Sequence, residues 1–360
     1  MPDDTSIKAW LTLGLIRGLG GEGARHLLSE FGSPEAVLSA PLDRLKTVVK
    51  PNVAQAVRNG VDEVALNAAL VWLSEAQNHL VTLADSDYPQ ALFNINDPPL
   101  LLYVKGRRDL LNAKSLAIVG SRHATPQGID NAEQFANSLS DAGLCIISGM
   151  AHGIDAAAHR GALRGKGSSI AVVGTGLDKV YPAANRELAH SLAKAGALIS
   201  EFPLGTPPLA GNFPRRNRLI SGMSIGCLVV EASLQSGSLI TARQAMEQGR
   251  DVFAIPGSIH SPQSRGCHKL IKQGAKLVET AQDILEELTG LFTPTQIQAA
   301  KPAAGSHTGL LEQMGFDPVS IDGLCLRSGL TVSQLSAMLL TLELEGCIAT
   351  LPGGLFQRIH

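Results

Sequence analysis

The sequence predicts an α/β protein with a doubly wound, mainly parallel sheet in the middle of the chain. Three observations predict this fold. Short, continuous apolar runs recur along the centre of the chain, and a helix-patterned segment follows each of them. Such runs are typical of parallel strands that helices cover on both faces. With 44% hydrophobic and only 4% aromatic residues, the 360-residue chain has enough aliphatic side chains for this kind of core.

The N-terminal segment predicts a separate helical domain. Residues 6–75 follow an amphipathic helical pattern, which Gly18 and Gly20 interrupt, and Ser33 and Pro34 match a helix start. A Gly-x-Gly turn between two helices resembles a helix-hairpin-helix, whose backbone amides can hold a DNA phosphate. Because the segment is slightly acidic, we favour a structural or protein-docking role for it. We therefore expect a helix-hairpin-helix or SAM-like domain at residues 1–78.

The central domain is expected at residues 79–290, where the apolar runs lie. The runs are "SLAIVG" (115–120), "LCIISG" (144–149), "SIAVVG" (169–174), "CLVVEAS" (227–233) and "DVFAIPG" (251–257). Their alternation with helical segments predicts parallel strands joined by crossover helices. In this architecture ligands bind beyond the carboxyl ends of the strands, where the strand order reverses. Nearly every glycine loop of the domain is expected at such an end.

A linker and a small third domain complete the chain. Residues 291–308, "LFTPTQIQAAKPAAGSHT", lack an apolar period and predict a flexible linker. Residues 309–360 show three helical segments and then a hairpin, which is the winged-helix pattern. The expected recognition helix, "TVSQLSAMLLTLELEG", carries Glu343 and Glu345 but no Lys or Arg. A helix that reads DNA usually has the opposite charge, so we favour protein docking or a structural role for this domain.

Charge is unevenly distributed along a chain whose formal net charge is only −2. Residues 81–276 hold 20 Lys and Arg against 14 Asp and Glu, whereas residues 277–360 hold 3 against 9. A basic middle between acidic ends favours an anionic partner for the central domain. Ordinary variation of surface charge remains the open alternative.

The cysteines and the N-terminus indicate a cytoplasmic protein. The five cysteines are scattered without a C-x-x-C pair, which fits reduced thiols and provides no zinc site. The acidic start "MPDDTS" does not match a secretory signal, and no stretch approaches the ~18 apolar residues of a membrane span. We therefore expect a cytoplasmic location and no membrane partner.

The sequence argues against a cofactor. The loop after residue 120, "GSRHAT", does not match G-x-G-x-x-G, and Lys179 stands where "VVGTGLD" would need a third glycine, so a nicotinamide site is disfavoured. No Walker loop is found. His152, Asp155 and His159 could share one helical face and bind a metal. We favour a helix cap at Asp155 with the histidines on a polar rim, and expect neither a metal nor another cofactor.

Two loops and an arginine cluster predict phosphate binding. Gly120 and the helix start after Pro126 would form an anion nest that holds Arg122. A second nest is expected at residues 236–238, with Thr241 close by. In "GNFPRRNRLISG" (211–222), three arginines lie within four positions and no acid is near them in sequence. Guanidinium groups bind phosphate bidentately, so we expect Arg215, Asn217 and Arg218 to project toward the same sheet edge as the nests.

Several motifs together resemble the bacterial DNA-processing protein A family, also called Smf. These are "AIVGSRHATPQG", "SGMAHGIDAAAH", "VVGTGLDKVYPAAN", "SEFPLGTPP", "NFPRRNRLISGMS", "SGSLITARQAMEQGRDVFAIPG" and "GCHKLIKQGA". They occur in this order over roughly residues 100–290 and are jointly very specific. The helical start and the winged-helix end resemble the accessory domains of the same family more loosely.

The resemblance implies a Rossmann-like dimer that binds and protects incoming single-stranded DNA during natural transformation. It also implies that the protein loads the RecA recombinase onto that strand in the face of single-strand-binding protein, a further candidate partner. No catalytic turnover goes with this role, so we expect no catalytic residues. The residues that we expect to bind DNA or phosphate are Gly120, Ser121, Arg122, Gly149, Gly153, Phe213, Arg215, Arg216, Asn217, Arg218, Ser236, Gly237, Ser238 and Thr241.

An enzyme that acts on nucleotides is the alternative. The expected sheet and its phosphate nests resemble those of sugar-cleaving phosphoribohydrolases, and Glu231 could serve as the catalytic carboxylate. The Pro-Gly-Gly-x-Gly-Thr loop of that family is absent, and Gln235 to Ser238 is the nearest stretch.

Overall fold

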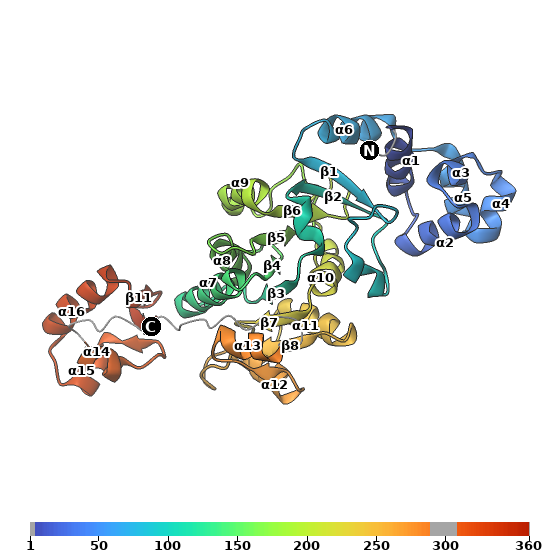
Figure 1. Cartoon of the computed structure of the whole chain (residues 1–360). Coiled ribbons are helices and arrows are strands. Elements are labelled where there is room, and N and C mark those ends of the chain that lie inside the picture. The colour runs from blue at the N-terminus through green and yellow to red at the C-terminus, as the bar shows by residue number, and fades with distance from the viewer. Residues whose placement is uncertain (1–3, 289–307, 360) are drawn as a thin grey trace.

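The computed structural model describes residues 4–288 and 308–359 of the chain. Figure 1 shows helices at the N-terminal end, a large sheet with helices on both faces in the middle, and a small domain at the C-terminal end. The linker expected at residues 291–308 lies outside the described residues, except for Thr308. The described helices include none that is long and apolar enough to cross a membrane.

The N-terminal domain consists of short helices around its own apolar core. Helix α3 begins directly after Ser33, whose hydroxyl accepts a hydrogen bond from the backbone N–H of Ala36, as expected for a capped helix start. Trp72 on α6 meets Tyr103 of the sheet in a T-shaped, edge-to-face contact, with ring centroids 5.9 Å apart. The domain is therefore also packed against the sheet. Its helices are α1 (Asp4–Leu15), α2 (Gly21–Phe31), α3 (Pro34–Ser39), α4 (Leu42–Val48), α5 (Pro51–Asn59) and α6 (Glu63–Leu73).

The central sheet confirms the prediction of a doubly wound, mainly parallel fold. Its strand order is β1-β2-β6-β5-β4-β3-β7-β8-β9, and every neighbouring pair from β6 to β9 is parallel. The strands that sequence analysis expected are β3 (Ser115–Val119), β4 (Cys145–Ser148), β5 (Ser169–Val172), β7 (Gly226–Val229) and β8 (Asp251–Ala254). Four strands were not expected, namely β1 (Asn78–Thr82), β2 (Leu101–Gly106), β6 (Ala197–Ser200) and β9 (Lys276–Leu277). Of these, β1 and β2 extend the sheet as antiparallel strands.

Helices cover both faces of this sheet, which explains the continuous apolar runs. One face packs against α10 (Asn212–Met223), α11 (Ser238–Glu247) and α12 (Arg265–Lys272). The other packs against α7 (Pro126–Asp141), α8 (Ile154–Ala162), α9 (Arg186–Ala195) and α13 (Ala281–Glu287). Short 3₁₀ turns lie at Gln90–Asn94, Arg108–Asn112 and Ala183–Asn185.

The strand order reverses between β3 and β7. From β3 the chain builds outward through β4, β5 and β6, and it then returns to add β7, β8 and β9 on the other side of β3. The crossovers on the two sides of this point cover opposite faces, so the loops that follow β3 and β7 diverge and leave a space between them.

The C-terminal domain confirms the winged-helix prediction. It consists of α14 (Thr308–Met314), α15 (Ile321–Ser328), α16 (Val332–Leu344) and the hairpin strands β11 (Ile348–Leu351) and β12 (Leu355–Arg358). The short strand β10 (Val319–Ser320), which was not expected, makes the wing three-stranded.

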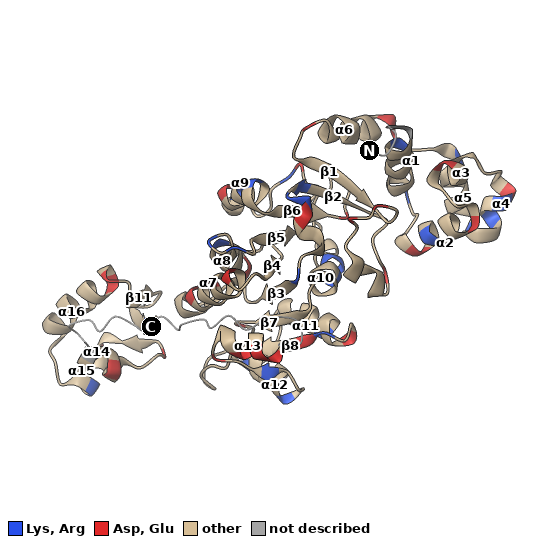
Figure 2. Ribbon diagram, viewed as in Figure 1, with Lys and Arg blue, Asp and Glu red and all other residues tan. Residues whose placement is uncertain are grey.

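Figure 2 shows basic residues on α10 and α12 of the central domain and acidic residues on α13.

The contact between Trp72 and Tyr103 predicts how strongly the N-terminal helices depend on the sheet. Trp72 is 9% exposed, so Trp72→Ala is expected to lower the free energy of unfolding by about 3–5 kcal/mol, because it leaves a cavity against β2. Its neighbour Val71 is 70% exposed, and Val71→Ala is the matched control with an expected change within about 0.5 kcal/mol. Urea unfolding followed by circular dichroism measures both, and equal effects of the two changes would contradict the packing described.

Candidate DNA-binding cavity

A cavity of about 600 Å³ lies where the strand order reverses. Its wall is formed by the loop after β3, the loop after β7, and the first two turns of α10 and α11. It is large enough for a nucleotide unit, since ligand sites in proteins measure about 300–1,000 Å³. Of the expected site residues, those that line it are Gly120, Ser121, Arg122, Phe213, Arg216, Asn217, Ser236, Gly237, Ser238 and Thr241.

Arg122 is the exposed cation of the cavity. Its guanidinium lies over the ring of Phe213, 5.6 Å from the ring centroid. Within the described part of the chain, no carboxylate forms an ion pair with Arg122. The Tyr181 ring lies tilted beside the Phe213 ring, with the two ring centroids 5.8 Å apart. The wall therefore combines an unpaired positive charge with two aromatic rings.

Arg216 is a buried cation at the inner end of the cavity. It is 4% exposed, and its Nη1 donates to the carbonyl oxygens of Gly149, at 2.6 Å, and Val172. Burial lowers the pKa of Arg216 to about 10, while Asp155 acts in the opposite direction. The group therefore keeps its charge at neutral pH. A side chain at residue 149 would collide with the guanidinium, because a Cβ there would lie 2.6 Å from Nη1.

The loop before α11 supplies small polar groups to the opposite wall. The hydroxyls of Ser236 and Ser238 are 2.7 Å apart, and Gly237 precedes the helix without a side-chain cap. Backbone N–H groups at such a helix start, together with hydroxyls, are suited to an anion. Thr241 lies one turn further along and is 2% exposed. The second of the two expected nests therefore faces the cavity.

The first expected nest is occupied by the protein itself. Glu231, which follows β7, accepts hydrogen bonds from the backbone N–H and the hydroxyl of Thr125, at 2.9 and 2.6 Å. The Thr125 hydroxyl in turn accepts from the N–H of Gly128, so the start of α7 is satisfied. Burial raises the pKa of Glu231, and the bonds from Thr125 oppose this shift. The expectation of a phosphate at the start of α7 is therefore wrong, although Arg122 in the same loop does reach the cavity.

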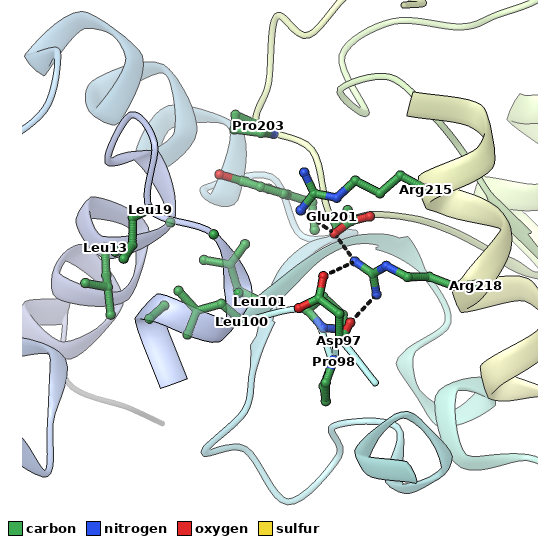
Figure 3. A pocket seen from close by; sticks show the side chains of 16 residues that line it. Leu13, Leu19, Asp97, Pro98, Leu100, Leu101, Glu201, Pro203, Arg215 and Arg218 are labelled. Atoms are coloured by element: carbon green, nitrogen blue, oxygen red, sulfur yellow. Dashed lines mark hydrogen bonds and ion pairs between the residues drawn. The ribbon is translucent and has the colours of Figure 1, made fainter. Parts of the chain in front are cut away.

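Arg215 and Arg218 lie at the expected carboxyl edge of the sheet but do not face the cavity. An acid of the protein pairs with both, so the expectation that they are free to bind phosphate is wrong. Both project from the other side of α10 toward Glu201 at the end of β6, as Figure 3 shows. The Nη2 of Arg215 is 3.1 Å from Oε2 of Glu201, and Arg218 contacts the same oxygen. The acid that pairs with them precedes the cluster by 14 residues or more in sequence, so their local sequence gives no sign of it.

Gly149 and Gly153 shape the cavity without lining it. Gly149 makes room for Arg216, as described above. Gly153 has a φ of +71° and packs so closely that a Cβ would lie 2.3 Å from the carbonyl oxygen of Ser121. Gly149 is therefore needed for space beside a side chain and Gly153 for its backbone geometry, and the cavity lining does not include them.

His152, Asp155 and His159 do not form a metal site. His159 is fully buried, with Nδ1 2.7 Å from the Ser169 hydroxyl, whereas His152 is exposed. The part of the chain that the structure describes contains no group of three potential metal ligands. The expected helix cap is wrong, because no side chain caps the start of α8 and Asp155 instead accepts from the N–H of Ala151, 3.3 Å away, in the loop before the helix. The expected rim of histidines is wrong for His159.

Sequence reasoning missed part of the lining. The most informative omission is Tyr181, since the chain has only 3 tyrosines and 9 phenylalanines. It lies in a loop after β5 and reaches Phe213 because that loop and the start of α10 lie at the same sheet edge. The other missed lining residues are Val119, His123, Ala151, Asp155, Pro208, Ala210, Pro214, Ile220, Ser233 and Ile240.

Comparison with known proteins identifies the family. A family profile described as "DNA recombination-mediator protein A" matches residues 79–289. The chain belongs to this family. A second profile, described as a "DprA winged helix domain", matches residues 293–354. Among curated family members, Protein Smf of Escherichia coli (strain K12) is 44% identical over 303 residues, which cover 81% of this chain and 80% of that protein.

Solved structures of the family share the fold. The DNA processing protein A from Streptococcus pneumoniae has a TM-score of 0.69 at 38% identity, covering 78% of this chain and 96% of that one. The homologue from Helicobacter pylori, described for its single-stranded DNA binding mode, has a TM-score of 0.55 at 30% identity. That match covers 60% of this chain and 98% of the other.

The buried His159 predicts a pH dependence of stability. The Ser169 hydroxyl donates to the Ile146 carbonyl, so Nδ1 of His159 carries the proton, and Nε2 has no hydrogen-bond partner in the described part. Burial, reinforced by Arg216 and Arg160, lowers the pKa of His159 from 6.5 to about 3. Between these values the unfolded chain binds a proton that the folded protein does not bind. The stability contributed by neutral His159 is therefore full above pH 6.5 and is lost as the pH falls toward 3.

Urea unfolding of the wild type and of His159→Gln between about pH 7 and 4 tests this expectation. The wild type should lose up to about 1.4 kcal/mol per pH unit more than the variant. His190→Gln, at an exposed position on α9, is the control and should follow the wild type. Parallel pH profiles for wild type and His159→Gln would show that His159 is not responsible.

Proposed function

We propose that this protein binds single-stranded DNA in the cavity between β3 and β7 and acts as a recombination mediator. In this role it protects incoming DNA and loads RecA onto it during natural transformation. The cavity would hold the sugar-phosphate backbone, with Arg122 and the loop at residues 236–238 as the phosphate contacts.

The free guanidinium of Arg122 is the observation that carries the proposal. It lies at the edge of a cavity of nucleotide size, stacked on Phe213 and without a carboxylate partner among the described residues. A cation held over an aromatic ring is placed to bind a phosphate while the ring contacts a base. Arg216 adds a fixed positive charge from the inner end of the cavity.

The composition of the wall favours binding without strong sequence preference. The two aromatic rings can stack on any base, and Arg122 and the serine hydroxyls suit phosphate oxygens. Stacking requires an unpaired base, which favours a single strand over a duplex. The homologue described for binding single-stranded DNA shares the fold, which supports the same ligand for this chain.

Our proposal includes RecA, single-strand-binding protein and a second copy of the chain as partners, and a cytoplasmic location. Membership of the recombination-mediator family supports it. The winged-helix domain is proposed to dock a protein partner. Helix α16 exposes Leu340 and Leu344 beside Glu343 and Glu345, a surface better suited to a protein than to DNA.

We propose no catalytic turnover for this protein. The enzyme alternative depended on Glu231, and both oxygens of that carboxylate accept hydrogen bonds from Thr125. A carboxylate that caps a helix in this way is positioned to stabilise the loop that carries Arg122. Its two engaged oxygens argue against a role as general base or nucleophile.

Arg122→Ala tests the proposed phosphate contact. The variant should bind a fluorescein-labelled single-stranded oligonucleotide at least about tenfold more weakly, in the range expected for loss of one charge-assisted contact. The slope of log K against log salt concentration should become shallower by about 0.7, the value expected for one phosphate contact on a single strand. Arg164→Ala, which removes an exposed arginine paired with Glu133, is the control. Unchanged affinity and slope for Arg122→Ala in fluorescence anisotropy would refute the assignment.

Phe213→Ala tests the stacking contact separately from charge. Loss of a stacked base should weaken binding by about 1–3 kcal/mol for oligonucleotides of any sequence and should leave the salt slope unchanged. The same anisotropy titration measures both quantities. A loss confined to one base composition would indicate base reading in place of stacking.

A further inference from the structure

We infer that Glu201 is a positioning residue for DNA binding, which holds α10 through Arg215 and Arg218 so that the opposite side of the helix faces the cavity. This inference rests on the proposed function. It assigns Arg215 and Arg218 to the support of the site, in place of the phosphate contacts expected from the sequence.

Helix α10 presents different residues to its two sides. Phe213, Arg216 and Asn217 line the cavity, whereas Arg215 and Arg218 point to Glu201. The spacing explains this division, because residues three or four positions apart share one side of a helix. A small rotation of α10 would therefore move both sets of side chains together.

Glu201 is more deeply buried than the acid of a typical surface ion pair. Its side chain is 3% exposed, and one oxygen, Oε2, contacts both arginines. Burial raises the pKa of Glu201, and the two guanidinium groups oppose that shift. Arg218 is 12% exposed, so without Glu201 its charge would be buried with only part of its partners. Breaking one side of a buried pair is costly for this reason.

Besides the pairs with Glu201 and Asp97, the side-chain hydrogen bonds that tie the first two turns of α10 to the rest of the described chain come from Asn212 and Arg216. Gly211 precedes the helix and provides no side-chain cap. The amide of Asn212 donates to the carbonyl of Gly174, 3.0 Å away, and Arg216 supplies the contacts on the cavity side. The pairs with Glu201 are therefore a main constraint on the rotation of the first two turns.

The ion pairs of Arg218 extend through Asp97 to the N-terminal domain. Arg218 donates to the carbonyl oxygen of Asp97 and lies 3.7 Å from its carboxylate. On the other side of Asp97, Arg25 of α2 is 3.1 Å from the carboxylate and donates to the Pro98 carbonyl at 2.6 Å. Figure 3 shows Asp97 and Glu201 on either side of the Arg218 guanidinium. The N-terminal helices and α10 thus share one set of ion pairs.

A direct phosphate contact at this position is disfavoured by space. The pocket lined by Glu201, Arg215 and Arg218 measures about 60 Å³, one tenth of the cavity on the other side of α10. It also contains two carboxylates, Asp97 and Glu201, which repel a phosphate. A nucleotide fits the larger cavity only.

Glu201→Gln separates positioning from electrostatics, because the two predict opposite signs. Removing a negative charge from a DNA-binding protein strengthens binding if charge alone matters. If Glu201 positions α10, the variant should bind a labelled single-stranded oligonucleotide about tenfold more weakly with an unchanged salt slope. Glu187→Gln, which removes an exposed acid at the start of α9, is the matched control and should bind as the wild type does or slightly more tightly.

Arg218→Gln and the double variant, which combines Glu201→Gln with Arg218→Gln, complete the experiment. Arg218→Gln should weaken binding to a similar extent without a shallower slope, and the double variant should show much less than the sum of the two effects. Circular dichroism melting checks that each variant is folded. If Glu201→Gln does not fold, Asp97→Asn decides: weaker binding at an unchanged slope supports the inference, and unchanged or tighter binding overturns it.

Besides the Asp97→Asn result, two outcomes overturn the inference while leaving the proposed function intact. One is unchanged or tighter binding by folded Glu201→Gln. The other is a slope that becomes shallower by about 0.7 in Arg218→Gln, since this would identify Arg218 as a phosphate contact. Failure of the wild type to bind single-stranded DNA would instead refute the proposed function itself.

Discussion

The buried guanidinium of Arg216 ties helix α10 to the carboxyl ends of β4 and β5. It donates to the carbonyl oxygens of Gly149, just beyond β4, and of Val172, the last residue of β5, so a charge carried by one element is solvated by two others. A buried cation is tolerated only with such partners, and here they are supplied by backbone at a sheet edge. The cavity depends on this contact, because the contact sets the distance between α10 and the loops that follow the strands. Asp155 and Gly149 adjoin it, the first as a compensating charge and the second by leaving space.

The architecture was predictable because it depends on local pattern. The apolar runs that became β3, β4, β5, β7 and β8 are continuous, and sheet burial on both faces requires this continuity. Strand β9 has only two residues, β6 directly follows helix α9, and β1 and β2 follow the helical domain, so their patterns were not distinct. The cavity lining was predicted where it depends on strand ends, as for Arg122 and the loop at residues 236–238.

The errors share one physical cause, which is that a charge in sequence does not reveal its partner in space. Arg215 and Arg218 appeared unpaired because Glu201 and Asp97 reach them from other elements. The start of α7 appeared open because Glu231 comes from a strand about a hundred residues away. His159 appeared to be a rim residue because its spacing matched one helical face, yet that face packs against Ser169. Periodicity shows which residues share one face of a helix, but it does not show which element packs against that face.

The two hydrogen bonds between Glu231 and Thr125 reduce the conformational entropy that the loop carrying Arg122 would lose on ligand binding. The short segment from Ser121 to Thr125 is held at both ends. At one end the N–H of Ser121 donates to the Glu231 carbonyl at 2.7 Å and the Ser121 carbonyl accepts from the N–H of Ile154. At the other end the N–H of Thr125 donates to the Glu231 carboxylate. Arg122 therefore extends from a rigid support, and the ligand has only side-chain rotations left to freeze. Preorganisation of this kind turns a larger share of the contact energy into net affinity. It also suits the single-stranded DNA proposed as the ligand, because a flexible polymer loses conformational freedom of its own when it binds.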